Sequence, residues 1–197
     1  MREVIKLGLI LLLITSVAAV VLGITNDATS VIIEQREQEE KAQALKVLIP
    51  NADEFIQIEE TLFADRQDIV EAYEGLKDGV VVGYAVKVNP SGYGGDVNII
   101  VGFTNEGITT GIIIGTHTET PGLGSKIEDE VFVNQFTDRM TDNALVSVKR
   151  SVEQDNEVQA ISGATVSSDA VINGVNAAIS FLREVIMNHS SGCSCCG

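Results

Sequence analysis

The stretch "VVVGYAVKV", residues 80–88, decides the fold class of this chain. Apolar side chains recur at every second position, from Val80 and Val82 through Tyr84 and Val86 to Val88. A period of two is that of a β-strand, because successive side chains point to opposite faces. We therefore predict a strand over these residues, and the sequence on either side predicts how the sheet continues.

Similar runs lie on both sides of this strand. The run "IVEAYEG" (69–75) precedes it across the turn residues "KDG", and "VNIIVGFT" (97–104) and "ITTGIIIGTH" (108–117) follow it. A later run, "ALVSVKR" (144–150), is also typical of a strand. Short strands joined by Asp-Gly and Asn-Glu-Gly turns predict an antiparallel meander. The stretch "GYGG" (92–95) lacks the G-x-G-x-x-G spacing, so we assign its glycines to tight turns.

Helical patterns appear at two places after the strands. Ser125 and Glu128 form a Ser-x-x-Glu capping box, which predicts a helix start, and Phe132 and Phe136 on that helix are expected in the core. A second helix is predicted from Ser168 as N-cap, with Asp169 in its first turn; its apolar stripe is Val171, Val175, Ala178, Leu182 and Val185. The predicted class is α+β, an antiparallel β-meander with packed helices on a single N-terminal transmembrane helix.

The N-terminus predicts the membrane anchor. Residues 7–24 contain no charge and are nearly all apolar; Arg2 and Lys6 precede them and Asp27 follows. At about 1.5 Å per residue, this run comes close to crossing a hydrocarbon core of about 30 Å. The positive-inside rule places the N-terminus in the cytoplasm and the rest outside. A cleaved signal peptide is the alternative, but the run is long and lacks an Ala-x-Ala site, so we expect an uncleaved anchor.

The predicted organisation has five parts. They are a cytoplasmic N-terminus (1–6), the transmembrane helix (7–24), a helical stalk (25–50), the folded domain (51–188) and a cysteine-containing tail (189–197). Cys193, Cys195 and Cys196 are too clustered for a disulfide framework and one short of the usual iron–sulfur set. We expect a tail without an essential role; metal capture shared with a partner, or lipidation, are the alternatives.

The charge balance argues against a nucleic-acid partner. The chain has 28 acidic and 13 basic residues, a formal net charge of −15. Phosphate backbones require patches of Lys and Arg, and the sequence shows none. We also predict no metal site: His117 beside Glu119 is interpreted as a solvated strand-end histidine, because no second His or Cys lies near it. Tyr84 and Tyr93 are interpreted as packing residues.

Two Gly-rich turns, "PGLGS" (121–125) and "SGAT" (162–165), each lead into a predicted helix. A helix start offers unpaired N–H groups and partial positive charge, which suit a phosphate. Gly163 and Ala164 would let a ligand approach the main chain, and Thr165 would supply a hydroxyl there. No His, Lys or terminal amine lies nearby in sequence to activate Thr165, so we expect an acceptor and no catalytic residue. A merely structural loop is the alternative.

The anchor, "GYGG", "ETPGLG" and "SGATVSS", in this order, resemble the G subunit of the Rnf electron-transport complex. They also resemble the related C subunit of the sodium-pumping NADH:quinone reductase. The resemblance implies that residues 51–188 form an FMN-binding domain. It implies that FMN is joined through its phosphate to Thr165 by a separate flavin transferase that uses FAD. Family members often carry an acidic residue where this chain has Gln159.

The resemblance also implies the remaining cofactor-binding residues. Glu119 and Thr120 would make polar contacts with the flavin, Gly122 would allow close backbone approach, and Leu123 would pack on the ring. On the phosphate side it implies Ser162, Gly163 and Ala164 of the SGAT turn, and Lys149 to balance the charge.

The implied function is a membrane-anchored electron carrier in an ion-pumping ferredoxin:NAD oxidoreductase. The chain would be an electron-transfer subunit, not catalytic alone, with the other Rnf subunits as partners and its flavin domain on the extracytoplasmic side. The alternatives are the corresponding FMN subunit of the quinone reductase and a non-redox, membrane-tethered assembly module. Chain length favours the Rnf protein.

Overall fold

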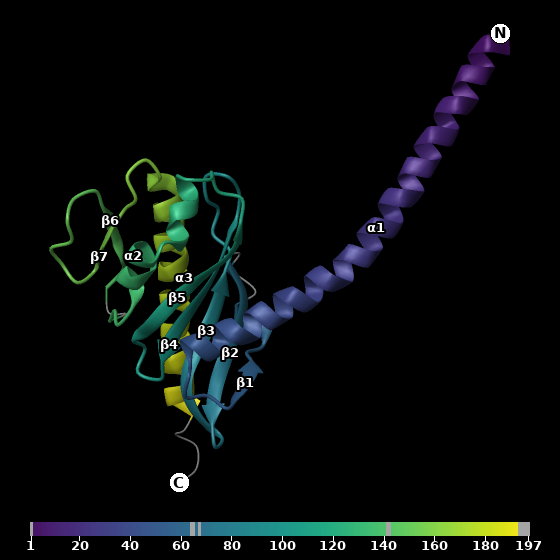
Figure 1. Cartoon of the computed structure of the whole chain (residues 1–197). Helices are drawn as coiled ribbons and strands as arrows, with labels where there is room; N and C mark the ends of the chain where they lie inside the picture. The colour runs from purple at the N-terminus through teal and green to yellow at the C-terminus, as the bar shows by residue number, and fades with distance from the viewer. Residues whose placement is uncertain (1, 64–65, 67, 141–142, 193–197) are drawn as a thin grey trace. The chain divides into compact units, whose positions relative to one another are not determined.

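The computed structural model describes residues 2–63, 66, 68–140 and 143–192 (Figure 1). The chain divides into two compact units, residues 1–43 and residues 44 onward. Cys193, Cys195 and Cys196 lie outside the described residues, so the expectations for them stay predictions.

The first unit consists of α1 (Arg2–Leu48) as far as Gln43; the last residues of this helix belong to the second unit. Residues Ile5–Asn26 of this helix have a mean hydropathy of 2.8 and are long enough to cross a membrane. Leu7, Leu11 and Leu22 expose 66 %, 65 % and 70 % of their surface. A long run of exposed apolar side chains is unfavourable in water and favourable in lipid, which agrees with the predicted anchor.

The second unit is built on a five-stranded sheet. Its strands are β1 (Glu54–Gln57), β2 (Ile69–Lys77), β3 (Val80–Val88), β4 (Val97–Thr104) and β5 (Thr109–His117), in the spatial order β1-β2-β3-β4-β5. Each neighbouring pair is antiparallel, so the predicted meander is confirmed (Figure 1). Asp78 and Gly79 join β2 to β3 with φ of 51° and 79°, the left-handed values that a two-residue hairpin turn requires.

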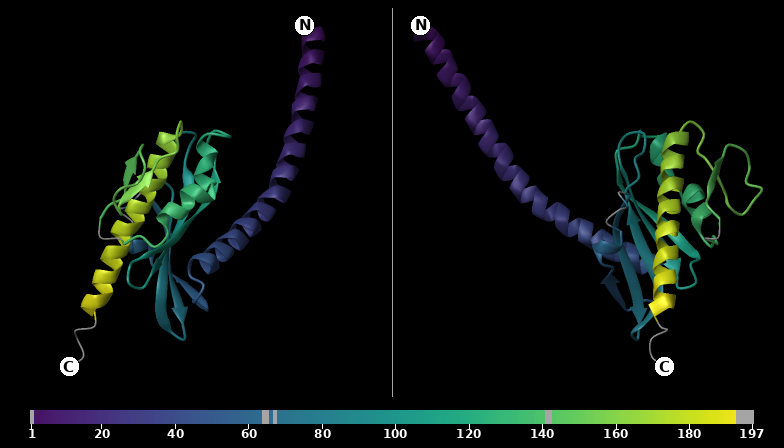
Figure 2. Two further views of the ribbon diagram at one scale, coloured as in Figure 1. Left: turned by 60° about the vertical axis from the view of Figure 1, so that its left-hand side comes forward. Right: turned by 180° about the vertical axis from the view of Figure 1, so that it is seen from behind.

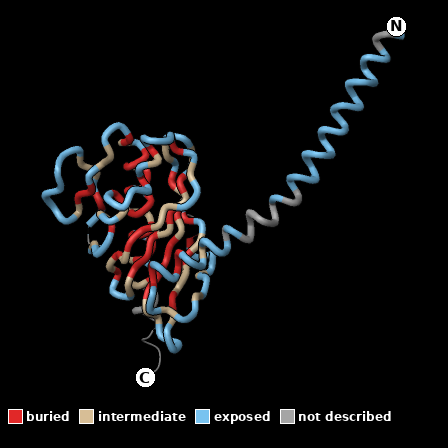
Figure 3. The backbone as a smooth tube through the Cα atoms, viewed as in Figure 1, coloured by how far each residue is buried: buried red, intermediate tan, exposed pale blue. Residues whose placement is uncertain are grey.

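One face of this sheet is covered by α3 (Thr165–Gly192), which runs along it (Figure 2). The predicted helical stripe is buried throughout: Val171, Val175, Ala178, Leu182 and Val185. The strands contribute a matching set of fully buried side chains, Val86, Val88, Val97, Ile99, Val101 and Phe103. Buried residues accordingly lie in the interior of the domain, in the strands and in α3 (Figure 3). Each buried Val, Ile, Leu or Phe side chain among these contributes about 1.5–3 kcal/mol when it leaves water.

The other face of the sheet bears glycines on three neighbouring strands. They are Gly75 of β2, Gly83 of β3 and Gly102 of β4, here called the glycine patch. A Cβ on Gly83 would lie 2.6 Å from the Phe103 carbonyl oxygen, closer than real Cβ atoms come. Cβ atoms on Gly75 and Gly83 would also lie 3.1 Å and 3.0 Å from Ile49 Cγ2, so Ile49 leaves little room for side chains at these two positions.

Residues after the membrane segment fill the space that the glycine patch leaves. Leu45 and Leu48, at the end of α1, and the following Ile49 are buried in one apolar cluster with Ala85 of β3. A Cβ on Gly102 would lie 2.7 Å from Leu48 Cβ. The packed domain thus begins before residue 51, the boundary that we predicted, because residues 44–49 belong to its core.

Three short helical segments follow β5: η2 (Gly124–Glu128), α2 (Glu130–Val133) and η3 (Asn134–Phe136). The predicted capping box is wrong, because Ser125 lies inside the 3₁₀ turn and its Oγ accepts a hydrogen bond of 2.9 Å from the N–H of Gly122. Phe132 and Phe136 are buried as predicted, and their rings meet edge-to-face with centroids 5.4 Å apart.

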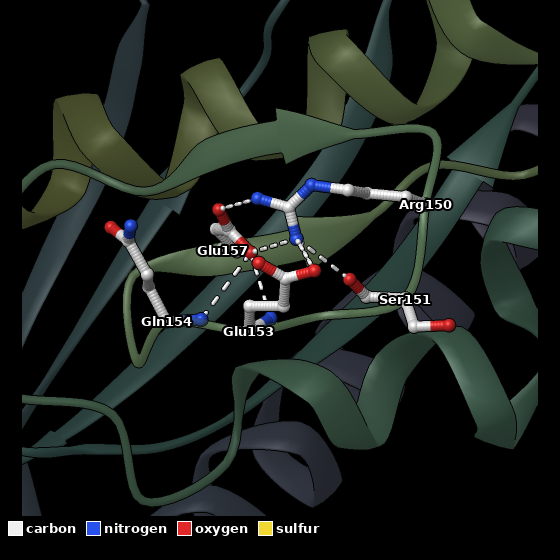
Figure 4. A network of polar contacts seen from close by, with 5 residues as sticks. All are labelled: Arg150, Ser151, Glu153, Gln154 and Glu157. Atoms are coloured by element: carbon white, nitrogen blue, oxygen red, sulfur yellow. Dashed lines mark hydrogen bonds and ion pairs between the residues drawn. The ribbon is translucent and has the colours of Figure 1, made fainter.

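The predicted strand near residue 146 is confirmed as β6 (Val146–Val148), which pairs in parallel with β7 (Glu157–Gln159). A bidentate ion pair closes the loop between them: Arg150 Nη2 lies 2.6 Å from Glu157 Oε1, and Arg150 Nη1 lies 3.1 Å from Oε2 (Figure 4). The N–H groups of Glu153 and Gln154 also donate to Glu157 Oε2. Paired fork geometry of this kind is the strong form of a charge-assisted bond.

Gly102→Ala should lower the free energy of unfolding by about 1–3 kcal/mol, because the added methyl group overlaps Leu48 in a packed core. Urea unfolding of the full chain in detergent measures this change. Gly115→Ala on β5 is the control, since its Cβ would lie 3.5 Å from the nearest atom, an ordinary contact. Equal effects of the two substitutions would contradict the role assigned to the glycine patch.

Glu157→Gln should destabilise the protein near neutral pH and lose this effect in acid. The N–H of Glu153, Arg150 and the N–H of Gln154 lower the pKa of Glu157. Burial acts in the opposite direction, but its effect is smaller than theirs together. A carboxyl with a lowered folded-state pKa stabilises the fold above its unfolded pKa, and this contribution is lost as the pH falls through the folded value. Urea midpoints against pH measure it. Glu153→Gln, an exposed partner of Arg150, should show a much smaller change.

Candidate functional site

A pocket of about 500 Å³ lies where three segments meet: the 92–95 turn between β3 and β4, the 119–124 turn after β5, and the start of α3. Its volume falls within the range of small-molecule and cofactor sites. The residues that line it are Tyr93, Glu119, Thr120, Leu123, Gly124, Gly163, Ala164, Thr165, Val166 and Ser167.

The pocket brings together six of the nine residues that the sequence and its resemblance predicted. They are Glu119, Thr120, Leu123, Gly163, Ala164 and Thr165. Gly122 and Ser162 are exposed neighbours of lining residues but do not line the pocket themselves. Lys149 is exposed on the loop after β6 and is not among the lining residues, so the structure gives no support to its predicted role.

Thr165 is the first residue of α3 and is half-buried. The helix therefore begins four residues before Asp169, the first helical residue that we predicted, and Ser168 lies inside the helix instead of capping it. First-turn N–H groups have no intrahelical acceptor and carry the positive end of the helix dipole, so an anion is favoured there. Gly163 precedes the helix with φ of 83°, a left-handed value that suits glycine.

The three hydroxyls of this turn have different roles. Ser168 Oγ donates to the Ala164 carbonyl and accepts the N–H of Ile161, both at 3.0 Å, which fixes the SGAT turn to the helix. Ser167 Oγ donates to Glu119 Oε2 at 2.7 Å. Within the described part of the chain, the hydroxyl of Thr165 has no such partner. It is the one hydroxyl of the three that remains available to a ligand.

Glu119 is 5 % exposed, and protein donors occupy both of its carboxylate oxygens. Oε1 accepts the N–H groups of Tyr93 at 2.7 Å and Gly94 at 3.3 Å, and Oε2 accepts the hydroxyl of Ser167. Burial raises the pKa of Glu119, but these hydrogen bonds and the nearby His117 outweigh it and lower the pKa below its ordinary value. Glu119 is therefore an anion at neutral pH.

Glycines make room for this carboxylate. A Cβ on Gly92 would collide with Glu119 Oε1, and a Cβ on Gly124 would collide with Oε2 and lie 2.9 Å from Ser167 Oγ. The glycines of "GYGG" and "ETPGLG" thus serve more than tight turns. They permit the close approach of two loops to one buried charge.

The mouth of the pocket is apolar. Tyr93, Leu123 and Val166 expose 72 %, 48 % and 54 % of their surface there. Of the two predicted packing tyrosines, Tyr84 is confirmed as buried, and the prediction for Tyr93 is wrong. Tyr93 lies in the 92–95 turn at the surface of the domain, where its ring does not pack into the core. An apolar mouth over an anion-attracting helix start fits an amphiphilic ligand with a flat ring and an anionic group.

His117 is not solvated as predicted, since its side chain is only 10 % exposed. Its Nε2 lies 2.8 Å from Glu128 Oε1, and its Nδ1 accepts the N–H of Glu119 at 3.3 Å. η2 brings Glu128 to the end of β5, which the sequence did not predict. Among the described residues, no group of three His, Cys, Asp or Glu side chains could hold a metal ion.

Sequence reasoning missed four lining residues: Tyr93, Gly124, Val166 and Ser167. A signal existed for each, because all four lie within or beside the three motifs. What the sequence could not supply is their juxtaposition, since Ser167 lies 48 positions from Glu119 along the chain.

Comparison with known proteins agrees with this geometry. A family model described as the FMN-binding domain matches residues 92–180, which contain all three segments of the pocket. Among solved structures, the C subunit of the Na⁺-translocating NADH-quinone reductase from Parabacteroides distasonis matches with a TM-score of 0.60 and 20 % identity. The match covers 77 % of this chain and 95 % of that one, and it shows a shared fold.

Two relatives match over nearly the whole chain. The G subunit of the Na⁺-translocating ferredoxin:NAD⁺ oxidoreductase complex of Acetobacterium woodii is 39 % identical, over 93 % of this chain and 94 % of its own length. The G subunit of the ion-translocating oxidoreductase complex of Methanosarcina acetivorans is 31 % identical, over 92 % and 95 %. Sequence, fold and pocket agree, and the chain belongs to the family of G subunits of the Rnf ion-translocating oxidoreductase complexes.

Proposed function

We propose that this chain is a membrane-anchored flavoprotein subunit that carries electrons through FMN within an ion-pumping ferredoxin:NAD oxidoreductase complex. Family membership and the FMN-binding domain match support the flavin and the complex. The observation that carries the finer proposal is the hydroxyl of Thr165, which is uncommitted among the described residues and lies at the start of α3 on the pocket wall.

The residues present fit FMN. A phosphate would be held by the first-turn N–H groups of α3, where Gly163 leaves the main chain open. Leu123 and Tyr93 offer apolar surface to the ring at the pocket mouth, and Thr120 offers a polar contact. When bound, FMN supplies reversible one- and two-electron transfer, and the protein holds it and excludes competing reactions.

We further propose that FMN is esterified to Thr165. A phosphoester would form between Thr165 Oγ1 and the FMN phosphorus, while the pyrophosphate bond of an FAD donor breaks. AMP is the leaving group, and the hydroxyl proton is released. No lining residue is a His or Lys that could take this proton, so a separate flavin transferase is required. A covalent link suits a carrier outside the cytoplasm, because a dissociated cofactor would be lost.

The proposed partners are the other subunits of the complex, since the relatives are named as subunits of such assemblies. The proposed topology follows from charge. Arg2 precedes the apolar segment Ile5–Asn26, Lys6 is the second residue of that segment, and Asp27 follows it. The positive-inside rule then leaves the N-terminus in the cytoplasm and the flavin domain outside.

Thr165→Ala should abolish covalent flavin, because the ester oxygen is removed. The full chain is co-expressed with a flavin transferase, and flavin fluorescence is measured in a denaturing gel. Intact mass should rise in the wild type by one FMN less one water. Ser151→Ala, an exposed residue on the loop after β6 that does not line the pocket, should keep the label. A wild type that stays non-fluorescent after denaturation, or a labelled Thr165→Ala variant, would exclude the ester.

Orientation is tested by thiol labelling of intact cells. Cys193, Cys195 and Cys196 are first replaced by serine, and a single cysteine is then introduced as Glu130→Cys, at an exposed site on α2. A membrane-impermeant maleimide should label this variant in intact cells. Glu3→Cys, which leaves Arg2 and Lys6 in place, should react only after permeabilisation, and the reverse pattern would overturn the proposed topology.

A further inference from the structure

We propose that Glu119 is a positioning residue of the flavin pocket: its carboxylate fastens the 92–95 turn and the first turn of α3 to the 119–124 turn and so holds Thr165 in place. The inference rests on the proposed flavin function for its consequences, but its geometry is independent of any ligand. It differs from the role first expected for Glu119, which was direct contact with the flavin.

The hydrogen bonds of Glu119 indicate that its side chain binds other parts of the protein. Glu119 lines the pocket but is 5 % exposed, and three protein donors converge on its two oxygens. These donors come from residues 25 and 26 positions earlier and 48 positions later in the chain. One carboxylate thus joins three segments that approach each other only in the folded domain.

A carboxylate suits these donors better than a neutral side chain. It is acceptor-only, with two oxygens and about four lone-pair sites, and it faces two N–H groups and one O–H group. Glutamine would keep one acceptor oxygen for Tyr93 and Gly94, and its amide nitrogen could donate to Ser167 Oγ. Alanine would leave all three donors without this acceptor, which is costly for buried groups.

The two glycines beside Glu119 are an independent observation. Added Cβ atoms on Gly92 and Gly124 would collide with different oxygens of the same carboxylate. The 92–95 turn and the end of the 119–124 turn, which contains Glu119 itself, thus have no side chain at the points where they approach the carboxylate. A side chain that served only to contact a ligand would not require this space behind it.

The consequence for the site follows from Ser167. This residue lies two positions after Thr165 in the same helical turn, and its hydroxyl is bound to Glu119. The bond fixes the start of α3 against the 119–124 turn. Loss of the carboxylate should let the first turn shift relative to Leu123 and Thr120, which line the same pocket as Thr165.

The first experiment uses flavin-free protein, the full chain carrying Thr165→Ala. In this background, Glu119→Ala should raise amide exchange at Tyr93 and Gly94 by about tenfold, because each loses its acceptor. Glu119→Gln should restore most of the protection. Glu130→Ala, which removes an exposed acid from α2, is the control and should change neither amide. Unchanged exchange in Glu119→Ala would overturn the proposal.

A double-mutant cycle tests the link to Gly124. If this glycine exists to accommodate the carboxylate, Gly124→Ala should shift the urea midpoint less in the Glu119→Ala background than in the wild type. Additive shifts would mean that the two residues act separately, and would overturn the proposal.

The loaded protein then tests the consequence. With Thr165 intact and the transferase present, Glu119→Ala should reduce flavin loading about tenfold and alter the visible circular dichroism of the remaining flavin. Glu119→Gln should largely restore both signals. Normal loading and an unchanged spectrum in Glu119→Ala would overturn the positioning role. If the wild type carries no flavin while the exchange and cycle results hold, then the flavin proposal fails and the joining role of Glu119 stands.

Discussion

The domain depends on one packing constraint: both faces of its five-stranded sheet are apolar, and both must be covered. α3 covers one face with a stripe of buried aliphatic residues. The other is covered by Leu45, Leu48 and Ile49, which fit against the glycine patch. Since α3 is held along its length by this core, its N-terminal turn is fixed beside the loops at one end of the sheet, and the pocket arises there. The residues that follow the membrane segment are thus also part of the fold of the domain.

Within the pocket, two opposite electrostatic features lie close together without cancelling. The start of α3 presents N–H groups that favour an anion, while Glu119 is itself an anion. Both can be present because the Glu119 carboxylate already accepts hydrogen bonds from Tyr93, Gly94 and Ser167. The N–H groups at the start of α3 therefore remain available to a ligand. The polar interior of the site is therefore divided between a part that holds the loops and a part that is open to a phosphate.

The proposed carrier role agrees with this arrangement. An electron carrier needs a cofactor that is held firmly and stays near the surface, because transfer to and from partners falls off with distance. The pocket mouth is apolar and exposed at Tyr93, Leu123 and Val166, while the proposed attachment point lies on a helix anchored in the core. An apolar segment long enough to span a bilayer precedes the domain, which fits a protein that works beside membrane partners.

The sequence alone determined the elements whose signals are local. Alternation at 80–88 and turn residues such as Asp78-Gly79 predicted the strands and their order, and the stripe from Val171 to Val185 predicted α3, because residues near in sequence determine periodicity. Of the ten residues that line the pocket, the small residues before α3 predicted Gly163, Ala164 and Thr165, and the resemblance to a known family implied Glu119, Thr120 and Leu123. Only the tertiary structure decided where α3 begins, that Ser125 forms no cap, that His117 faces Glu128, and that Tyr93 is exposed. Only the tertiary structure showed that the glycines of the strands and loops make room for neighbouring residues such as Leu48 and Glu119. Each of these depends on atoms brought together from distant positions, and a side chain's partner at such a distance leaves no periodic trace in the sequence.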